Sequence, residues 1–449
     1  MFFVRNILLL ILLVTSLHAA PSNLIIYDAP ANMEAAPEYK LEVDGRNVFV
    51  YNTRSAAFAY FSFDGKVDVK VTFASQIYDF DIRPKSKNIE GEQYRNQIQF
   101  ALDKPLNLSV EINKNLKRPL FIFANPLETN VPDKKNNDVL FFEKGKIHTP
   151  GEVLIKSDQT VYIEGGAVVR GHFKTNGSKN VKITGRGILD NRLYTKGQFR
   201  PIEINQSEHV EVSGIIIAES RHWTCASHAS RHVVYDNLKV VSSNDWDDGI
   251  DIVGSQHIMV NNCFIQSKDD CIAIKAGTKY FTDFSSEFIV NDVVIQNSVL
   301  WNGDWGNALE IGFETRADTI KNITFRNCDI IHAEGPEGTF TIHNGDRAVI
   351  TNILYEDIRV EDSRGWLIDF RILESVYSKD DQRGKIENVH FKNIFVEGEK
   401  YPSSQMLGFN DVYRINRVTL EDFFIHGNKI TSIYNGMISI AHIENLEFK

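Results

Sequence analysis

Short stretches of alternating apolar and polar residues run along most of the chain, and their spacing changes at about residue 136. Before that point, Asp44-Gly45 and Asp64-Gly65 separate the stretches as turn signals. The alternating stretches there are residues 40–43, 48–51, 58–63 and 67–71. Alternation interrupted by such turns is typical of strands in a β-sandwich. We therefore predict a β-sandwich domain over residues 21–135.

After residue 139, a five-residue pattern recurs, with apolar residues at its first and third positions and Asn, Asp or Gly at its fifth. The fifth positions are Gly185, Gly214, Asn237, Asn262, Asn297, Asn327, Asp357, Asn393 and Asp422. The interval between them ranges from 23 residues (Gly214 to Asn237) to 36 residues (Asp357 to Asn393). A coil of three short strands joined by turns needs about this many residues. We therefore predict an all-β chain with a right-handed parallel β-helix over residues 136–449. A leucine-rich horseshoe is disfavoured, because Ile, Val and Phe stand where Leu should dominate.

Composition and charge limit the kinds of partner. Apolar residues make up 43% of the chain and charged residues 24%, as in soluble globular proteins. The net charge of −10 makes nucleic acid and anionic membranes poor partners. Residues 1–20 combine Arg5, an apolar core at 7–14 and His18-Ala19-Ala20, as in a secretory signal peptide, and the apolar run is too short to span a bilayer. We therefore predict export to the periplasm or the medium, without membrane insertion.

Two acidic clusters carry the strongest chemical signal. The pair Asp269-Asp270 begins 21 positions after Asp248, which is close to the length of one coil. Because stacked strands lie about 4.8 Å apart in register, we expect Asp248, Asp269 and Asp270 to project together. Carboxylates this close raise each other's pKa, and a protonated carboxyl beside an ionised one is what glycosidic bond hydrolysis requires. From the spacing alone, a Ca²⁺ site and a solvated acidic ladder remain alternatives.

The two clusters also resemble a known pair of elements. Asp247-Asp248-Gly249-Ile250-Asp251 and Asp269-Asp270-Cys271-Ile272-Ala273 are similar, in sequence and in separation, to the signature of the polygalacturonase family, glycoside hydrolase family 28. The resemblance implies a pectin-lyase-like β-helix and an inverting hydrolase. By position, it implies that Asp269 is the general acid and that Asp248 and Asp270 hold the attacking water. Inversion needs about 6.5–9.5 Å between acid and base carboxyls, so we expect that separation between Asp248 and Asp269.

The region after Asp270 departs from that family. Its Gly-His-Gly element has no counterpart, and its basic Arg-Ile-Lys element falls near Asn307-Ala308-Leu309-Glu310-Ile311-Gly312. An acidic Glu310 at this place would repel a uronate carboxylate. Residues 299–332 resemble instead the dextranase and isopullulanase family, glycoside hydrolase family 49, which also places a β-sandwich before its β-helix. This second resemblance favours a neutral α-linked glucan as substrate, with pectin, or another algal or host glycan, as the alternative.

Further residues are expected to surround the substrate. Aromatic faces suit the apolar faces of sugar rings, and Lys275 is either a sugar ligand or a cation that neutralises the acidic cluster. The predicted substrate-binding residues are Trp246, Lys275, Trp305, Glu310, His343 and Arg371, with His222, Trp223 and Trp301 as weaker candidates. The four cysteines lack metal-binding spacing, so neither a metal nor a cofactor is expected.

Three classes of function fit an exported β-helix. The carboxylates favour a hydrolase that acts on a polysaccharide or its oligosaccharides. A polysaccharide lyase on the same fold would need an Arg or Lys base, usually with Ca²⁺, so an acid-rich site argues against it. A non-catalytic glycan-binding β-helix would have no need for paired carboxylates one coil apart.

Overall fold

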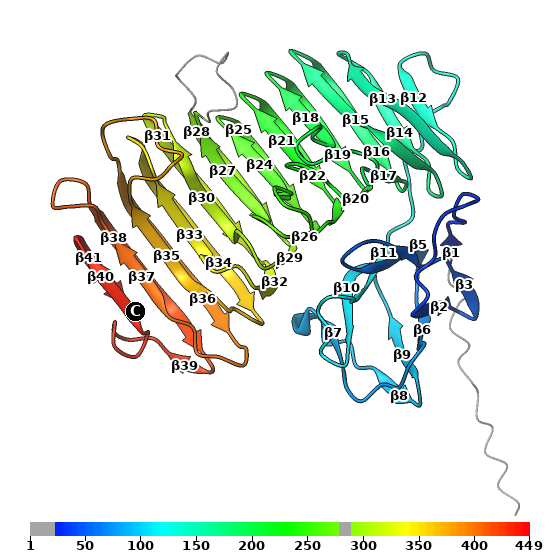
Figure 1. Cartoon of the computed structure of the whole chain (residues 1–449), viewed down its shortest axis with the longest axis horizontal. Helices are drawn as coiled ribbons and strands as arrows, with labels where there is room; N and C mark the ends of the chain where they lie inside the picture. Colours follow the sequence, from blue (N-terminus) through cyan, green and yellow to red (C-terminus); the bar gives the residue numbers. More distant parts are fainter. Residues whose placement is uncertain (1–22, 278–288) are drawn as a thin grey trace, which may run out of the picture.

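The computed structural model describes residues 23–277 and 289–449, and nearly all of its regular structure is β-strand. Figure 1 shows two small N-terminal sheets in blue and cyan, beside an elongated solenoid that runs from cyan to red. The predicted signal peptide lies outside the described residues. Within the described ranges, no helix has the length and apolar character that a membrane span needs.

The N-terminal part is a sandwich of two sheets whose inward-facing residues form one apolar core. The first sheet has the order β1(Asn23–Ile26), β5(Ala57–Asp64), β11(Leu120–Asn125), β10(Leu106–Ile112), β7(Phe80–Arg83), with β4(Tyr51–Asn52) also paired to β5. The second has the order β3(Arg46–Val48), β2(Tyr39–Val43), β6(Val67–Phe73), β9(Gln97–Leu102), β8(Glu92–Tyr94). A short 3₁₀ helix, η1(Lys85–Lys87), follows β7. The pairs are antiparallel except β5 with β11, which run parallel. The predicted β-sandwich is therefore present.

The rest of the chain winds as a right-handed parallel β-helix with three stacks of strands, as predicted. Stack 1 comprises β12(Val139–Phe142), β14(Thr160–Ile163), β16(Lys179–Gly185), β19(Glu208–Ser213), β22(Arg231–Asp236), β25(Gln256–Asn261), β28(Val290–Gln296), β31(Thr319–Arg326), β34(Val349–Val360), β36(Lys385–Val396), β38(Ile415–Ile425) and β41(Ile443–Phe448). Stack 2 comprises β17(Ile188–Asp190), β20(Ile216–Ala218), β23(Lys239–Val241), β26(Phe264–Ser267), β29(Val299–Asn302) and β32(Asp329–Ala333), and the later halves of β34, β36 and β38 continue it.

Stack 3 carries the acidic clusters at the start of two of its strands. It comprises β18(Ile202–Asn205), β21(Cys225–His228), β24(Ile250–Val253), β27(Ile272–Ala276), β30(Asn307–Thr315), β33(Gly338–Asn344), β35(Trp366–Ile372), β37(Ser404–Leu407) and β40(Ile438–Ala441). The long strands β13(Ile147–Ile155) and β15(Val168–Asn176) pair along their length, and β15 joins stacks 2 and 3; β39(Asn428–Lys429) pairs antiparallel to β38.

The repeat pattern explains how each coil closes. Its apolar positions, such as Ile258 and Val260 on β25, point into one continuous core. The Asn or Asp at its end adopts the left-handed conformation, for example Asn297 at φ 54° and Asn327 at φ 48°. Asn and Asp tolerate this conformation better than other non-glycine residues. The side chain of Asn327 donates to that of Asn297 at 2.7 Å, so successive turns form a polar ladder.

The sandwich docks against stack 2 through aromatic side chains. Phe121 and Phe123 on β11 pack against Phe264 on β26 and Trp301 on β29, with ring centroids 4.7 to 5.7 Å apart. Trp301 is 2% exposed, and its indole Nε1 donates to Glu334 at 3.0 Å. The expectation that Trp301 stacks on sugar is therefore wrong, because the sandwich covers it.

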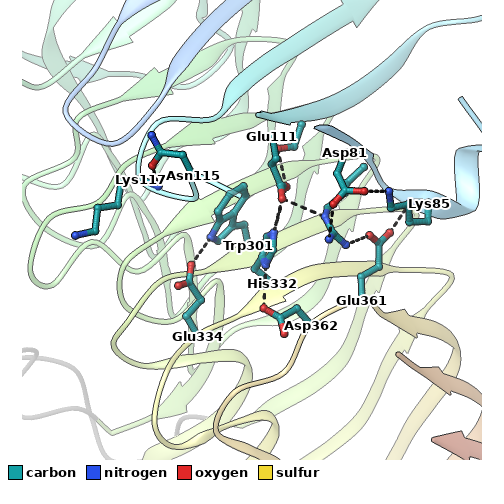
Figure 2. Close-up of polar contacts among 12 residues, drawn as sticks. Asp81, Lys85, Glu111, Asn115, Lys117, Trp301, His332, Glu334, Glu361 and Asp362 are labelled. Atoms are coloured by element: carbon teal, nitrogen blue, oxygen red, sulfur yellow. Dashed lines mark hydrogen bonds and ion pairs between the residues drawn. The ribbon is translucent and has the colours of Figure 1, made fainter. Parts of the chain in front are cut away.

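A buried charge network closes the same interface (Figure 2). His332 contacts the Glu111 carboxylate through Nε2 at 3.1 Å and Asp362 through Nδ1 at 3.3 Å. Arg83 joins Glu111 at 3.1 Å and Glu361 at 2.5 Å. Burial alone would lower the pKa of His332, but Asp362 and Glu111 outweigh burial and raise it to about 8. At neutral pH, His332 is thus a buried cation between two carboxylates.

We expect this network to make the free energy of unfolding depend on pH. The pKa of an unfolded histidine is about 6.5, so the stabilisation is fully present below that pH and is lost as pH rises through 8. The shift corresponds to about 2 kcal/mol. Urea unfolding of the native chain and of His332→Gln, from pH 6 to pH 9, should show their difference shrinking by that amount. His390→Gln, which removes an exposed histidine paired with Glu421, is the control. A difference that does not change with pH would contradict this account.

Candidate active site

Two turns of adjacent coils bring the acidic clusters together. Asp248 precedes β24 and the pair Asp269-Asp270 precedes β27; these strands pair in parallel, with Ile250 opposite Ile272. Asp248 and Asp270 are only 3% and 7% exposed, whereas Asp269 keeps partial exposure. After burial, the charge of Asp248 is the largest influence that raises the pKa of Asp269 and of Asp270. The three carboxyls therefore form one electrostatic site.

The environments of Asp269 and Asp270 differ. Burial and then Asp248 raise the pKa of Asp269 to about 8, and its Oδ1 accepts the N–H of Asp270 at 3.2 Å. The pKa of Asp270 is also raised, by burial, then by Asp248 and by Asp269. The Oδ1 of Asp270 accepts two hydrogen bonds from Asn307, from N–H at 2.8 Å and from Nδ2 at 3.0 Å. Because burial and the neighbouring carboxyls disfavour the ionised forms of Asp269 and Asp270, the trio holds a proton at neutral pH, and Asp269 is its most exposed member.

Asp247 ties the two turns to each other. Its Oδ2 accepts the N–H of Asn244 at 2.7 Å, and its Oδ1 accepts those of Lys268 at 2.9 Å and Asp269 at 3.2 Å. Burial raises the pKa of Asp247 to about 6, although these hydrogen bonds act in the opposite direction. The side chain is completely buried, so Asp247 is a positioning residue that fixes the backbone of both acidic turns.

Lys275 neutralises the buried end of the cluster. Its Nζ lies 2.8 Å from Asp248 Oδ2 and 2.9 Å from Asp251 Oδ1, and 4.2 Å from the ring centroid of Trp223. Burial would lower the pKa of Lys275, but Asp248 and Asp251 raise it well above its ordinary value. Of the two roles predicted for Lys275, the geometry matches the neutralising one, because the side chain is only 6% exposed.

Glu310 and His343 lie beneath Arg371 and not at the surface. Both are completely buried. His343 Nδ1 contacts Glu310 at 3.1 Å, His343 Nε2 lies 3.2 Å from Asp369, and Arg371 pairs with Asp369 at 2.8 Å. Burial opposes protonation of His343, but Glu310 and Asp369 raise its pKa to about 9, which favours the cation at neutral pH even though the Arg371 guanidinium lies 2.8 Å from Nε2. Glu310 therefore presents no charge to a substrate, and only Arg371 of this group retains exposed surface.

A cleft of about 330 Å³ opens beside Asp269 between two exposed tryptophans. Trp246 is 52% exposed and Trp305 is 61% exposed. On the rim, Lys196 and Lys268 pair with the same Asp245 at 3.1 Å and 2.8 Å. The rim therefore carries charges of both signs next to two aromatic side chains.

The comparison with family models decides the family of this chain. The model described as "Glycosyl hydrolases family 28" matches residues 143–441, which is more than half of the chain. The chain belongs to glycosyl hydrolases family 28. The matched residues contain both acidic turns and, except for β12 and β41, the strands of all three stacks.

Curated relatives are about 25% identical to this chain over the residues that align. The exopolygalacturonase rpg15 of Rhizopus delemar is 25% identical over 58% of this chain and 66% of its own length. A probable endo-xylogalacturonan hydrolase A of Aspergillus fumigatus is 25% identical over 55% of this chain and 62% of its own length. The chain thus spans slightly less than two thirds of the length of these two relatives.

Solved structures extend the likeness of fold to the sandwich. Dex49A from Penicillium minioluteum aligns with a TM-score of 0.60 over 95% of this chain and 96% of its own, at 14% identity. An exopolygalacturonase from Thermotoga maritima aligns with a TM-score of 0.54 over 69% of this chain and 84% of its own, at 17% identity. These alignments support the right-handed β-helix. Dex49A also covers the N-terminal sheets.

Some residues of this family 28 site were not identified from the sequence. Asp247 and Asp251 lie within the acidic stretch that the sequence singles out, but neither has a distinguishing signal there. Gly306 follows Trp305 in the turn before β30, and Asn307 is the first residue of that strand. Gly306 has φ +60°, and a Cβ there would lie 2.5 Å from Asp269 Oδ1. Only the folded turn reveals that a glycine must stand against the carboxyl of Asp269.

Replacing Gly306 by Ala should therefore displace Asp269. A misplacement of about 1 Å in a catalytic group can cost roughly 100-fold in rate, and we expect a fall of that order in kcat with a folded protein. Gly177→Ala is the matched control, because Gly177 has φ +66° with no atom within 4 Å of the added Cβ. Steady-state kinetics and circular dichroism of both variants test this. Equal activity in the two variants would show that crowding at Asp269 is unimportant.

Proposed function

We propose that the chain is an inverting glycoside hydrolase that acts on a uronate-containing, pectic polysaccharide or its oligosaccharides. The observation that carries the proposal is Asp269, a partly exposed carboxyl with a pKa of about 8 that lines the cleft between Trp246 and Trp305. A carboxyl that keeps its proton at neutral pH is suited to general acid catalysis.

The proposed reaction uses the trio in separate roles. Asp269 donates its proton to the glycosidic oxygen as the bond from the anomeric carbon to that oxygen breaks. A water molecule held by Asp248 and Asp270 attacks the anomeric carbon and gives its proton to this carboxylate pair. Lys275 fixes Asp248 by its ion pair at 2.8 Å, and Asn307 fixes Asp270. Attack opposite the leaving group inverts the configuration.

The charge around the cleft supports a uronate over a neutral sugar. Lys196 and Lys268 on the rim are cations that a substrate carboxylate can contact, although Asp245 pairs with both and Asp304 also acts on Lys268. Arg371 is a further partly exposed guanidinium on stack 3, although it pairs with Asp369 at 2.8 Å and with Glu337 at 3.7 Å. The curated relatives bear the names of a polygalacturonase and a xylogalacturonan hydrolase.

The predicted preference for a neutral α-linked glucan has less support. It depended on Glu310 repelling a uronate, but Glu310 is buried and paired with the imidazolium of His343. The likeness to Dex49A concerns the fold alone. Export, predicted from residues 1–20, fits action on an extracellular polymer and stays part of the proposal.

A substrate panel tests this function. We expect native protein to release reducing ends from polygalacturonate or xylogalacturonan and not from dextran or pullulan. Asp269→Asn should lower kcat by about 1,000-fold, because it removes the general acid. Asp357→Asn is the matched control, since Asp357 occupies a turn position that other coils fill with Asn. Cleavage of dextran alone would restore the glucan hypothesis, and inactivity on every glycan would overturn the hydrolase assignment.

The anomeric configuration and the ultraviolet absorbance of the products distinguish an inverting hydrolase from a retaining hydrolase and from a lyase. Proton NMR during the first turnovers should show a β-configured reducing end released from an α-linked polymer, as inversion requires. An initial α-product would contradict inversion. Unsaturated products that absorb in the ultraviolet would identify a lyase instead.

The activity should also depend on pH, and the decline of the rate at alkaline pH should follow the ionisation of Asp269. The acid is protonated below its pKa of about 8, so kcat/KM should fall about tenfold per pH unit above that value. Initial rates between pH 5 and pH 10, with circular dichroism at each pH to verify folding, measure this decline. A decline that begins near pH 4, the ordinary range of an aspartate, would exclude Asp269 as the acid.

A further inference from the structure

One position on stack 1 forms a ladder of side chains in the left-handed conformation. It lies one residue before the apolar pattern of each strand, as the pairing of Val210 with Val233 and of Val233 with Ile258 shows. Its occupants include Asp158, Asn180, His209, His232, His257, Asp292, Asn322, Asn352 and Asn388, all with φ between 54° and 65°. Amide hydrogen bonds join neighbours along it, such as Asn352 to Asn322 at 3.1 Å and Asn180 to Asp158 at 2.9 Å.

Three consecutive coils place histidine in this ladder. The rings of His209 and His232 stack with centroids 4.7 Å apart and 9° between their planes, and those of His232 and His257 with 4.7 Å and 6°. Asn would fit the backbone equally well and would continue the amide ladder, so the backbone conformation does not account for imidazole at these positions. The side chains are exposed to solvent.

Carboxylates stand at both ends of the histidine stack. Glu208 Oε1 lies 3.6 Å from His209 Nε2, and Asp292 Oδ2 lies 2.7 Å from His257 Nδ1. The donor atoms of Glu208, His209 and His232 all lie within 4.8 Å of one another.

We propose that Glu208, His209 and His232 bind a divalent transition-metal ion of the Zn²⁺ class. Two imidazoles and one carboxylate form a ligand set typical of Zn²⁺, with the fourth position open to water. Tetrahedral coordination places ligand atoms about 3.4 Å apart, and rotation of these exposed side chains closes the remaining gap. Glu208 also pairs with Lys179 at 3.1 Å, but an exposed ion pair of this kind opposes metal binding only weakly.

The proposed site is separate from the catalytic carboxyls. Asp248 precedes β24, whereas the histidine ladder follows the opposite end of that strand, at the start of the strands of stack 1. Bound metal would join β19 to β22, two strands that already pair, and would therefore stabilise the folded β-helix without entering the hydrolytic reaction.

Calorimetric titration of the untagged full chain with ZnCl₂ tests the proposal independently of hydrolysis. We expect one saturable site per chain, weakened at least tenfold by His232→Asn and by Glu208→Gln. Asn already occupies this ladder position at Asn180 and Asn322, so His232→Asn should fold. His442→Asn is the matched control, because His442 is also left-handed, exposed and paired with a carboxylate, Asp411, at 2.8 Å.

The same titration contains the results that would overturn the site. Unchanged affinity in both His232→Asn and Glu208→Gln would exclude it, as would a loss of binding in His442→Asn. A loss in Asp269→Asn would place the metal at the catalytic carboxyls instead. As a second measurement, ZnCl₂ should raise the unfolding midpoint of the native chain and not that of His232→Asn, because only a ligand of the folded state stabilises it.

Discussion

In-register stacking of one coil on the next is the constraint on which the rest of this structure depends. Each inward position of β24 continues through the later coils, so that Ile250, Ile272, Leu309 and Phe340 form one apolar line. The neighbouring outward line runs from Asp251 through Glu310 to Asp369. A one-residue slip would exchange the two lines, because the side-chain period of a strand is two. The same strand register therefore determines which residues enter the apolar core and which residues form the candidate site.

Stacking also creates an electrostatic problem, since an acidic residue at one position tends to face another about 4.8 Å away. The chain places cations between most of these carboxylates. Lys275 lies between Asp248 and Asp251, and His343 lies between Glu310 and Asp369. Among the described residues, no cation forms an ion pair with Asp269 or Asp270, and the pKa of each is raised. Burial also raises the pKa of Asp251 despite its ion pair with Lys275, so burial and neighbouring carboxyls together favour a retained proton in this cluster.

The sequence predicts features that repeat and misses features that depend on contacts distant in the chain. The meeting of Asp248 with Asp269 follows from an interval of one coil, so counting residues was sufficient. The burial of Glu310 depends on His343, 33 residues later, whose raised pKa could not be deduced from composition. Trp301 resembles a sugar-binding tryptophan in its local sequence, but Phe121 of the sandwich covers it. Asp247 stands next to Asp248 in the same acidic stretch, and its role is visible only from the backbone N–H groups that donate hydrogen bonds to its carboxylate.

The β-sandwich also helps to position the two acidic turns. Arg54, in a sandwich turn, donates to Asn244 at 3.0 Å, and the N–H of Asn244 donates in turn to Asp247. On the other side, Trp301 packs under the sandwich while the next residue, Asn302, donates to the carbonyl of Asp269 at 2.9 Å. Both acidic turns thus rest on residues that the sandwich holds in place. General acid catalysis depends on sub-ångström placement of the acid. A change that loosens the sandwich interface should therefore also displace Asp269.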